Sequence, residues 1–349
     1  MHFPLRRKIS AVLRHRPCDV VHAVDGVDLA VSRGEIVGLV GESGSGKSTL
    51  ARCVVGLYKP TAGQVLFHGK DLTAQRTRQE RRRIQIVFQD PYASLNPRMT
   101  VRQVLRELLA THQIVPRAQI GRRSGELLGL VGLGPRFLDV YPRQLSGGQR
   151  QRVSIARALA LEPEFLIADE PVSALDVSVQ ATILNVLIGL RDRLGLTILL
   201  VTHDMAVVRQ VSDRIAVMYL GKLVEVTETE AMFSDPRHPY TCALLAAVPT
   251  LTPERKSEAA AVIGDPPSPV HPPSGCRFHP RCPLAAPLCS EQEPSLVPGP
   301  DLPSHLASCH FAWTAAPISR SAEEGHAMRS QLESDNGGSA HEVGDDRHR

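Results

Sequence analysis

Two glycine-rich segments hold the residues that could do chemistry. Residues 41–49 read GESGSGKST, and residues 145–152 read LSGGQRQR. The first matches G-x-x-x-x-G-K-[ST], in which backbone N–H groups surround phosphates, a lysine adds positive charge and a hydroxyl reaches Mg²⁺. The second segment precedes a helix, and a helix N-terminus also attracts anions. The chain is therefore expected to bind a nucleotide and to catalyse phosphoryl transfer.

The first segment should supply most of the nucleotide contacts. Gly41, Gly44 and Gly46 let the backbone turn around the phosphates. Lys47 would neutralise the β- and γ-phosphates, and the Ser48 hydroxyl would bind Mg²⁺. Its other expected nucleotide-binding residues are Ser43, Ser45 and Thr49. A chance glycine-rich turn is the alternative, and the strand-loop-helix context disfavours it.

A pair of acidic residues follows the apolar run FLIAD (165–169). Asp169, at the end of this expected strand, could reach the Mg²⁺ beside the phosphate loop. Glu170 is the candidate general base for the attacking water. The alternative is that the pair simply caps a helix.

The order of these motifs resembles the ATP-hydrolysing subunits of ABC transporters. The resemblance implies an α/β P-loop NTPase fold, with a RecA-like core and a helical subdomain. It implies that Gln89, in the Q-loop, senses Mg²⁺ and water, and that His203 contacts the γ-phosphate. It also implies that LSGGQ, with Asp176 in the D-loop SALD, meets the ATP of a second subunit. The residues of LSGGQ concerned are Ser146, Gly147, Gly148 and Gln149.

Longer strings narrow the resemblance to one branch of that family. FQDPYASLNPRMTV (88–101), FSDPRHPYTCALLAAVP (233–249) and IGDPPSPVHPPSGCRFHPRCP (263–283) are similar to segments of oligopeptide/dipeptide importer ATPases. The resemblance covers about residues 20–312. It implies as partners two membrane permeases, an extracytoplasmic binding protein and a second ATPase, for which a paralogue is favoured. The expected location is peripheral, at the cytoplasmic face of the inner membrane.

Composition limits the other functions. The 349 residues are 42% hydrophobic and 22% charged, with a formal net charge of +4. This charge is too small to predict a nucleic-acid partner, and the arginine-rich run QRTRQERRR (75–83) is expected to be a solvated segment. A soluble ABC ATPase acting on nucleic acid or the ribosome is the alternative function, and a metal-sensing regulator is a third. The single cassette without heptads disfavours the alternative.

The apolar pattern predicts the elements and domains. Short apolar runs at 84–90, 165–169 and 197–203 are typical of buried parallel strands, and amphipathic helices are expected at 101–112 and 124–133. We expect an ATPase domain over 1–235 with a helical subdomain at about 90–146. Residues 236–314 should form a small Cys/Pro-rich domain rather than more sheet, and 315–349 a disordered tail. No signal peptide or membrane span is expected.

Two features concern cofactor and base recognition. Cys276, Cys282, Cys289 and Cys309 lie close enough in sequence for four thiolates to hold Zn²⁺ or a 4Fe–4S cluster. The resemblance favours the cluster, and free structural cysteines are the third possibility.

Related ATPases often stack the adenine on an aromatic residue before the phosphate loop. RPCDVVHAVDG (16–26) has none, so Val21 or His22 is expected to pack there.

Overall fold

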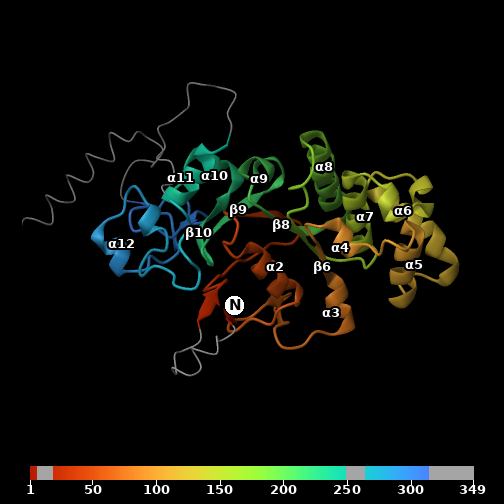
Figure 1. Ribbon diagram of the computed structural model, residues 1–349, viewed down its shortest axis with the longest axis horizontal. Coiled ribbons are helices and arrows are strands. Elements are labelled where there is room, and N and C mark those ends of the chain that lie inside the picture. Colours follow the sequence, from red (N-terminus) through yellow and green to blue (C-terminus); the bar gives the residue numbers. More distant parts are fainter. Residues whose placement is uncertain (6–18, 249–263, 314–349) are drawn as a thin grey trace, which may run out of the picture.

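The core of the protein is one large mixed sheet (Figure 1). The computed structural model describes residues 1–5, 19–248 and 264–313. The sheet has eight strands in the order β11-β12-β10-β9-β3-β8-β7-β6. Five of them run parallel: β3 (Ile36–Val40), β6 (Ile84–Val87), β7 (Phe165–Asp169), β8 (Thr197–Thr202) and β9 (Arg214–Tyr219). β10 (Lys222–Glu228) returns antiparallel to β9.

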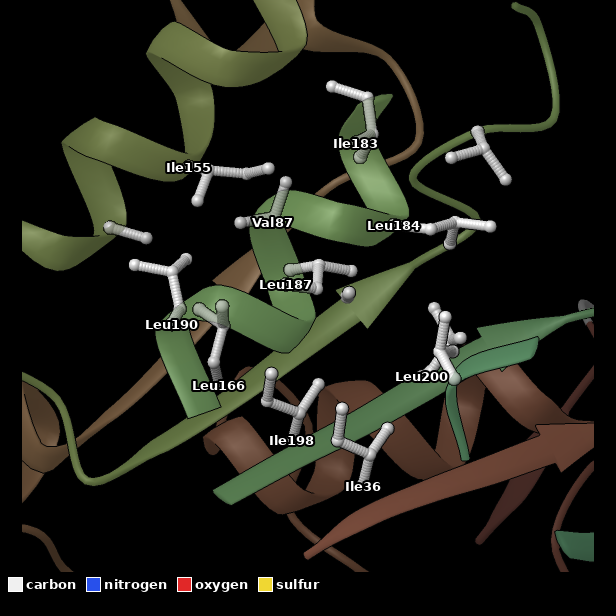
Figure 2. Packing of buried hydrophobic residues seen from close by; sticks show 14 of the residues in the cluster. Ile36, Val87, Ile155, Leu166, Ile183, Leu184, Leu187, Leu190, Ile198 and Leu200 are labelled. Atoms are coloured by element: carbon white, nitrogen blue, oxygen red, sulfur yellow. The ribbon is translucent and has the colours of Figure 1, made fainter. Parts of the chain in front are cut away.

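The central strands are apolar on both faces because helices cover both sides. Successive side chains of a strand point to opposite faces, so Ile36 and Val40 of β3 join one cluster while Val37 and Leu39 join another. The first cluster includes Leu187 of α8 (Val177–Leu194), as Figure 2 shows. The continuous apolar runs in the sequence thus correspond to strands buried between two layers.

The helices divide between the two faces of the sheet. In Figure 1, α2 (Lys47–Val55) and α3 (Arg78–Arg83) lie below the sheet, while α8 and α9 (Met205–Val211) lie above it. α7 (Gly147–Leu159) packs against α8 and β6. Two further helices, α10 (Thr229–Ser234) and α11 (Pro239–Ala246), follow the last long strand. This alternation of strand and helix confirms the predicted α/β core.

A helical region extends from one end of the sheet (right in Figure 1). It contains α4 (Pro91–Ser94), α5 (Val101–Thr111) and α6 (Ile120–Leu130). A short 3₁₀ turn, Arg117–Gln119, lies between α5 and α6, and two more follow α6 at Pro135–Asp139 and Pro142–Gln144. Thr100 begins α5 with a capping box to Gln103, and the apolar face of α5 is buried. Leu95 is only 3% exposed, whereas Tyr92 is 54% exposed. Leu95 therefore belongs to the core of this region and Tyr92 does not.

The C-terminal region adds two short strands to the main sheet. β12 (Leu306–Ala307) pairs with β10, and β11 (Val297–Pro298) pairs with β12. The expectation that this region adds no sheet is therefore wrong. β10 pairs with β9 along one edge, and β12 of the C-terminal region pairs with its other edge. The region also contains a 3₁₀ turn at His279–Arg281 and α12 (Pro287–Glu291). The predicted tail at 315–349 lies outside the described residues.

Two small antiparallel sheets of two strands each are separate from the main sheet. β1 (His2–Pro4) pairs antiparallel with β2 (Val20–His22), and β4 (Leu66–Phe67) with β5 (Lys70–Asp71). Within the described ranges, no helix is both long enough and apolar enough to cross a bilayer.

Candidate nucleotide-hydrolysis site

The phosphate loop connects β3 to α2, and close backbone contacts require its glycines. Gly46 caps α2 with a φ of 107°, a conformation that L side chains rarely adopt. A Cβ atom on Gly46 would lie 2.0 Å from the Ala23 carbonyl oxygen, and one on Gly41 would lie 2.1 Å from the Met218 carbonyl oxygen. Substitution at either position would displace the loop from the N-terminus of α2.

The ammonium group of Lys47 lies inside the loop. Lys47 is only 5% exposed, and its Nζ donates to the carbonyl oxygens of Gly41 at 2.6 Å and Glu42 at 2.9 Å. Burial lowers the pKa of Lys47, while the nearby carboxylates of Glu170 and Asp169 oppose that shift. The loop therefore holds a buried positive charge that has only backbone oxygens as hydrogen-bond partners.

Ser48 and Asp169 bring two oxygen donors together beside this lysine. The Ser48 hydroxyl donates to Asp169 Oδ1 at 2.9 Å. Asp169 is 3% exposed, and burial raises its pKa, with a further upward contribution from the charge of Glu170. A buried carboxylate next to a hydroxyl is the oxygen-rich type of donor set that Mg²⁺ prefers. These residues therefore fit the expected magnesium site.

Two strand ends place polar side chains beside Glu170, which itself follows a third strand, β7. Gln89, after β6, donates from Nε2 to Glu170 Oε2 at 3.0 Å. His203, after β8, places Nδ1 3.4 Å from Glu170 Oε1. Glu170 itself has a φ of 48°, and its N–H donates to the Val201 carbonyl oxygen. The turn after β7 thus aims this carboxylate toward both neighbours. Gln89 and His203 were found in the sequence only through the family resemblance.

The LSGGQ segment forms a separate group with the start of α8. Ser146 caps α7 in a capping box with Gln149. Gly148 lies against Val179, and a Cβ at Gly148 would approach Val179 Cγ1 to 2.2 Å. Asp176 is exposed at the N-terminus of α8. Across the described residues, no hydrogen bond or ion pair joins these positions to 41–49. The sequence-predicted residues therefore fall into two sets within one chain.

The other predicted residues of the loop differ in exposure. Ser45 is buried, and its Oγ has no hydrogen-bond partner. Ser43 and Gly44 are exposed, and Thr49 is half-buried. A buried hydroxyl without a partner is rare in folded proteins, which favours a ligand or solvent partner for Ser45.

Residues of the C-terminal region also contact the phosphate loop, and sequence analysis did not assign them. Arg281 donates from both Nη atoms to the two Glu42 carboxylate oxygens, at 2.9 and 3.1 Å. The Tyr240 hydroxyl accepts from the Glu42 N–H at 2.8 Å. Tyr240 and Arg281 lie in the strings HPY and CRFHPRCP. These strings were the available signal, but sequence spacing could not show that they meet the loop.

An aromatic residue reaches the region before the loop from the start of the chain. Phe3 of β1 lies opposite Val21 of β2, and its ring is 5.4 Å from that of Tyr58. Phe3 lies outside 16–26 in the sequence, and strand pairing brings it to this region from about twenty positions away. Val21 and His22 are half-buried.

The four cysteines line a common pocket. Cys276, Cys282, Cys289 and Cys309 surround it together with residues that include His238 and Phe278. Burial raises the pKa of Cys282 and of Cys309 to about 12. In the described parts of the chain, no three of these sulfur atoms lie within 4.8 Å of one another. Four thiolates on one Zn²⁺ would lie about 3.8 Å apart, given Zn–S bonds of about 2.3 Å. The arrangement is therefore wider than a closed zinc site.

Comparison with known protein families agrees with this geometry. A family model described as "ABC transporter" matches residues 24–173. A second, described as "Oligopeptide/dipeptide transporter, C-terminal region", matches residues 224–289. The oligopeptide transport ATP-binding protein AppF of Bacillus subtilis is 49% identical over 317 residues, which is 89% of this chain and 94% of AppF. The chain belongs to the ATP-binding proteins of the oligopeptide/dipeptide ABC transporter family.

Further relatives support the assignment of this ABC ATPase. A probable peptide ABC transporter ATP-binding protein of Sinorhizobium fredii is 47% identical, over 88% of this chain and 90% of the relative. Among solved structures, a dimeric ATP-binding cassette bound to ADP and Pi has a TM-score of 0.56 and 31% identity, covering 65% of this chain and 96% of the other. cbiO1 of Clostridium perfringens has the same TM-score with 32% identity, covering 61% and 84%.

The family and fold predicted from the sequence are thereby confirmed. The protein is an ATP-binding and ATP-hydrolysing subunit of a transporter. The alternative function, a soluble ABC ATPase acting on nucleic acid or the ribosome, is not favoured, because the match continues through the transporter-specific C-terminal region.

Proposed function

We propose that this ABC ATPase powers the import of oligopeptides, dipeptides or a related small solute. The similarity to AppF through both the cassette and the C-terminal region carries this proposal. The ATPase would act at the cytoplasmic face of the inner membrane. Its partners would be two permeases, an extracytoplasmic binding protein and a second ATPase, with a paralogue favoured over a second copy.

The proposed hydrolysis uses residues that converge at the ends of β3, β6, β7 and β8. The loop amides and Lys47 would bind the phosphates, and the γ-phosphate would then lie near Glu170. Ser48 and Asp169, with Gln89, would hold Mg²⁺, which would neutralise charge on the phosphates. Glu170 would accept the proton of the attacking water, and Gln89 and His203 would orient the Glu170 carboxylate through the contacts described above.

The second group of residues would complete a second subunit's site. Ser146, Gly147, Gly148 and Gln149 begin α7, where backbone N–H groups remain free to bind an anion. Their lack of contact with this chain's own phosphate loop supports a role across a dimer interface. Asp176 lies next to them in the fold and would face the same interface.

We also propose that the chain divides into an ATPase domain and a small C-terminal domain. An ATPase domain over 1–235 with a helical subdomain at 90–146 agrees with the position of α4 to α6 at the end of the sheet. For 236–314, strands β11 and β12 join the main sheet through β10. We therefore propose that this small domain folds onto the ATPase domain rather than separately.

We also propose that the four cysteines hold a 4Fe–4S cluster rather than Zn²⁺. They line one pocket, and the family resemblance favours the cluster. A cluster of four irons is larger than one Zn²⁺ ion and takes four thiolate ligands. Its role would be structural or regulatory.

Transport tests the main proposal. Cells that lack this ATPase should fail to take up labelled peptides, and the wild-type chain, but not Glu170→Gln, should restore uptake. A tagged chain isolated from membranes in mild detergent should also recover two permeases and a second ATPase. Unchanged peptide uptake in the deletion strain together with recovery of nucleic-acid proteins alone would overturn it.

Anaerobic purification tests the cluster. The wild-type protein should contain iron and sulfide in equal amounts, and Cys282→Ser should lose both. Cys53→Ser is the matched control, because Cys53 is a buried cysteine of α2 outside the pocket. A colourless protein with zinc or no metal would contradict the cluster while leaving the transport proposal intact.

A further inference from the structure

The arginine-rich segment around α3 lines an open pocket of about 500 Å³. From the sequence alone this segment was expected to be a solvated charged stretch. The fold brings it next to the end of α5 and to the residues after α7. The lining residues are Arg76, Arg78, Arg81, Arg82, Gln85, His112 and Leu161. None of them is acidic, and none belongs to the nucleotide site.

The positive charges of this pocket are only partly neutralised: the Glu80 carboxylate attracts Arg76, which also donates to three backbone carbonyl oxygens. Glu80, on α3, forms an ion pair with Lys70. Arg83 forms an ion pair with Glu164, which lies outside the pocket. Arg81 and Arg82 take part in no ion pair anywhere in the residues that the structure describes. Like charges that line one pocket repel one another. The pocket therefore carries a positive potential that an anion would relieve.

Two buried nitrogen atoms of the pocket also have no partner. Arg82 Nε and His112 Nδ1 are inaccessible to solvent and make no hydrogen bond. Buried polar atoms are satisfied in most folded proteins. Burial lowers the pKa of His112, and the charges of Arg78 and Arg82 lower it further. The imidazole therefore senses the same positive potential.

We propose that this pocket binds an anion carrying two or more phosphate groups. The guanidinium groups of Arg81 and Arg82 can each donate two parallel hydrogen bonds to phosphate oxygens, a geometry that lysine lacks. The volume is in the range of small-molecule sites. The phosphates could belong to a soluble compound or to an anionic phospholipid headgroup, and both sources share this chemistry.

The first experiment titrates inorganic pyrophosphate into the full chain by calorimetry. Lys47→Ala is present in every sample, so that the phosphate loop does not dominate the binding. Adding Arg81→Gln and Arg82→Gln should weaken pyrophosphate affinity at least tenfold. The matched control, Arg122→Gln, removes an exposed arginine of α6 and should leave affinity unchanged. Arg82→Lys keeps the positive charge but lacks the planar guanidinium group, so it should give an intermediate pyrophosphate affinity. Thermal unfolding verifies that each variant is folded.

The second arm distinguishes the source of the phosphates. Vesicles of phosphatidylcholine are compared with vesicles that also contain cardiolipin, an anionic phospholipid with two phosphate groups. Sedimentation with the anionic vesicles that is lost in the double variant would identify a lipid headgroup. Pyrophosphate binding without such sedimentation would identify a soluble ligand. Equal pyrophosphate affinity in the double variant and in Arg122→Gln would overturn the proposal.

Discussion

Arg281 and Glu42 form a two-armed ion pair that ties the C-terminal region to the phosphate loop. The two Nη–Oε distances are 2.9 and 3.1 Å, and Arg281 is only 7% exposed. Glu42 directly follows Gly41, and its backbone oxygen accepts from Lys47. The C-terminal region is thus in direct contact with the loop that is proposed to bind ATP.

Arg281→Met should destabilise both the fold and the loop. Removing the guanidinium leaves the Glu42 carboxylate half-buried without its partner, so the free energy of unfolding should fall by about 1–3 kcal/mol. ATP affinity should also fall several-fold, because the loop loses a restraint. Urea unfolding and nucleotide titration measure the two effects.

An exposed ion pair that is also two-armed provides the control. Arg102 contacts both carboxylate oxygens of Asp139 at 2.7 Å, and both residues are well exposed. Arg102→Met should leave both the free energy of unfolding and the ATP affinity nearly unchanged, because solvent screens an exposed ion pair. Equal effects of the two substitutions would show that the Arg281–Glu42 contact has no special role.

Gly148→Ala should disturb the packing of α7 on α8. The new Cβ would lie 2.2 Å from Val179 Cγ1, so the helices would have to separate, at a cost of about 1–3 kcal/mol. Gly129→Ala, at an exposed position of α6 with open space around it, should instead gain up to about 1 kcal/mol from helix propensity. Thermal unfolding compares the two, and equal melting temperatures would contradict the packing at Gly148.

Asp25 should make the free energy of unfolding depend on pH. Burial alone would raise its pKa, but hydrogen bonds from Arg277 and His2 outweigh burial and lower the pKa from 3.8 to about 2. On acidification the unfolded chain therefore takes up this proton before the folded one does. The contribution of Asp25, about 2 kcal/mol at most, is present above about pH 4 and is lost as the pH falls toward about 2.

Unfolding of Asp25→Asn at a series of pH values tests this linkage. The variant should be less stable than the wild type near neutral pH, and the difference should shrink between about pH 4 and 2. Asp28→Asn is the control, because Asp28 is exposed and makes no ion pair within the described residues. A constant difference across that range would contradict the assignment to Asp25.

The sequence was informative where local pattern and fixed motif spacing determine the structure. FLIAD corresponds residue for residue to β7, and the helix predicted at 101–112 is observed as α5 (Val101–Thr111). The separation of LSGGQ from the phosphate loop was also expected from the resemblance. These features depend on local periodicity or on a known order of motifs.

The contacts that sequence analysis missed join distant parts of the chain. Arg281 meets Glu42 across 239 positions, and Phe3 reaches the neighbourhood of Val21 through strand pairing. The arginines of α3 form a pocket only because α5 ends beside them. No local pattern encodes such pairings, since they depend on how helices and strands pack in three dimensions.

Glu170→Gln tests the central claim, that these residues form an ATP-hydrolysing site, most directly. The substitution keeps the side chain's shape and its place beside Gln89 and His203 but removes the carboxylate base. Phosphate release should fall about 10²- to 10⁴-fold while ATP binding, measured separately, is retained. Glu162→Gln, at an exposed position after α7, should leave both unchanged. If Glu170→Gln hydrolyses ATP at the wild-type rate, Glu170 is not the base and the proposed site is wrong.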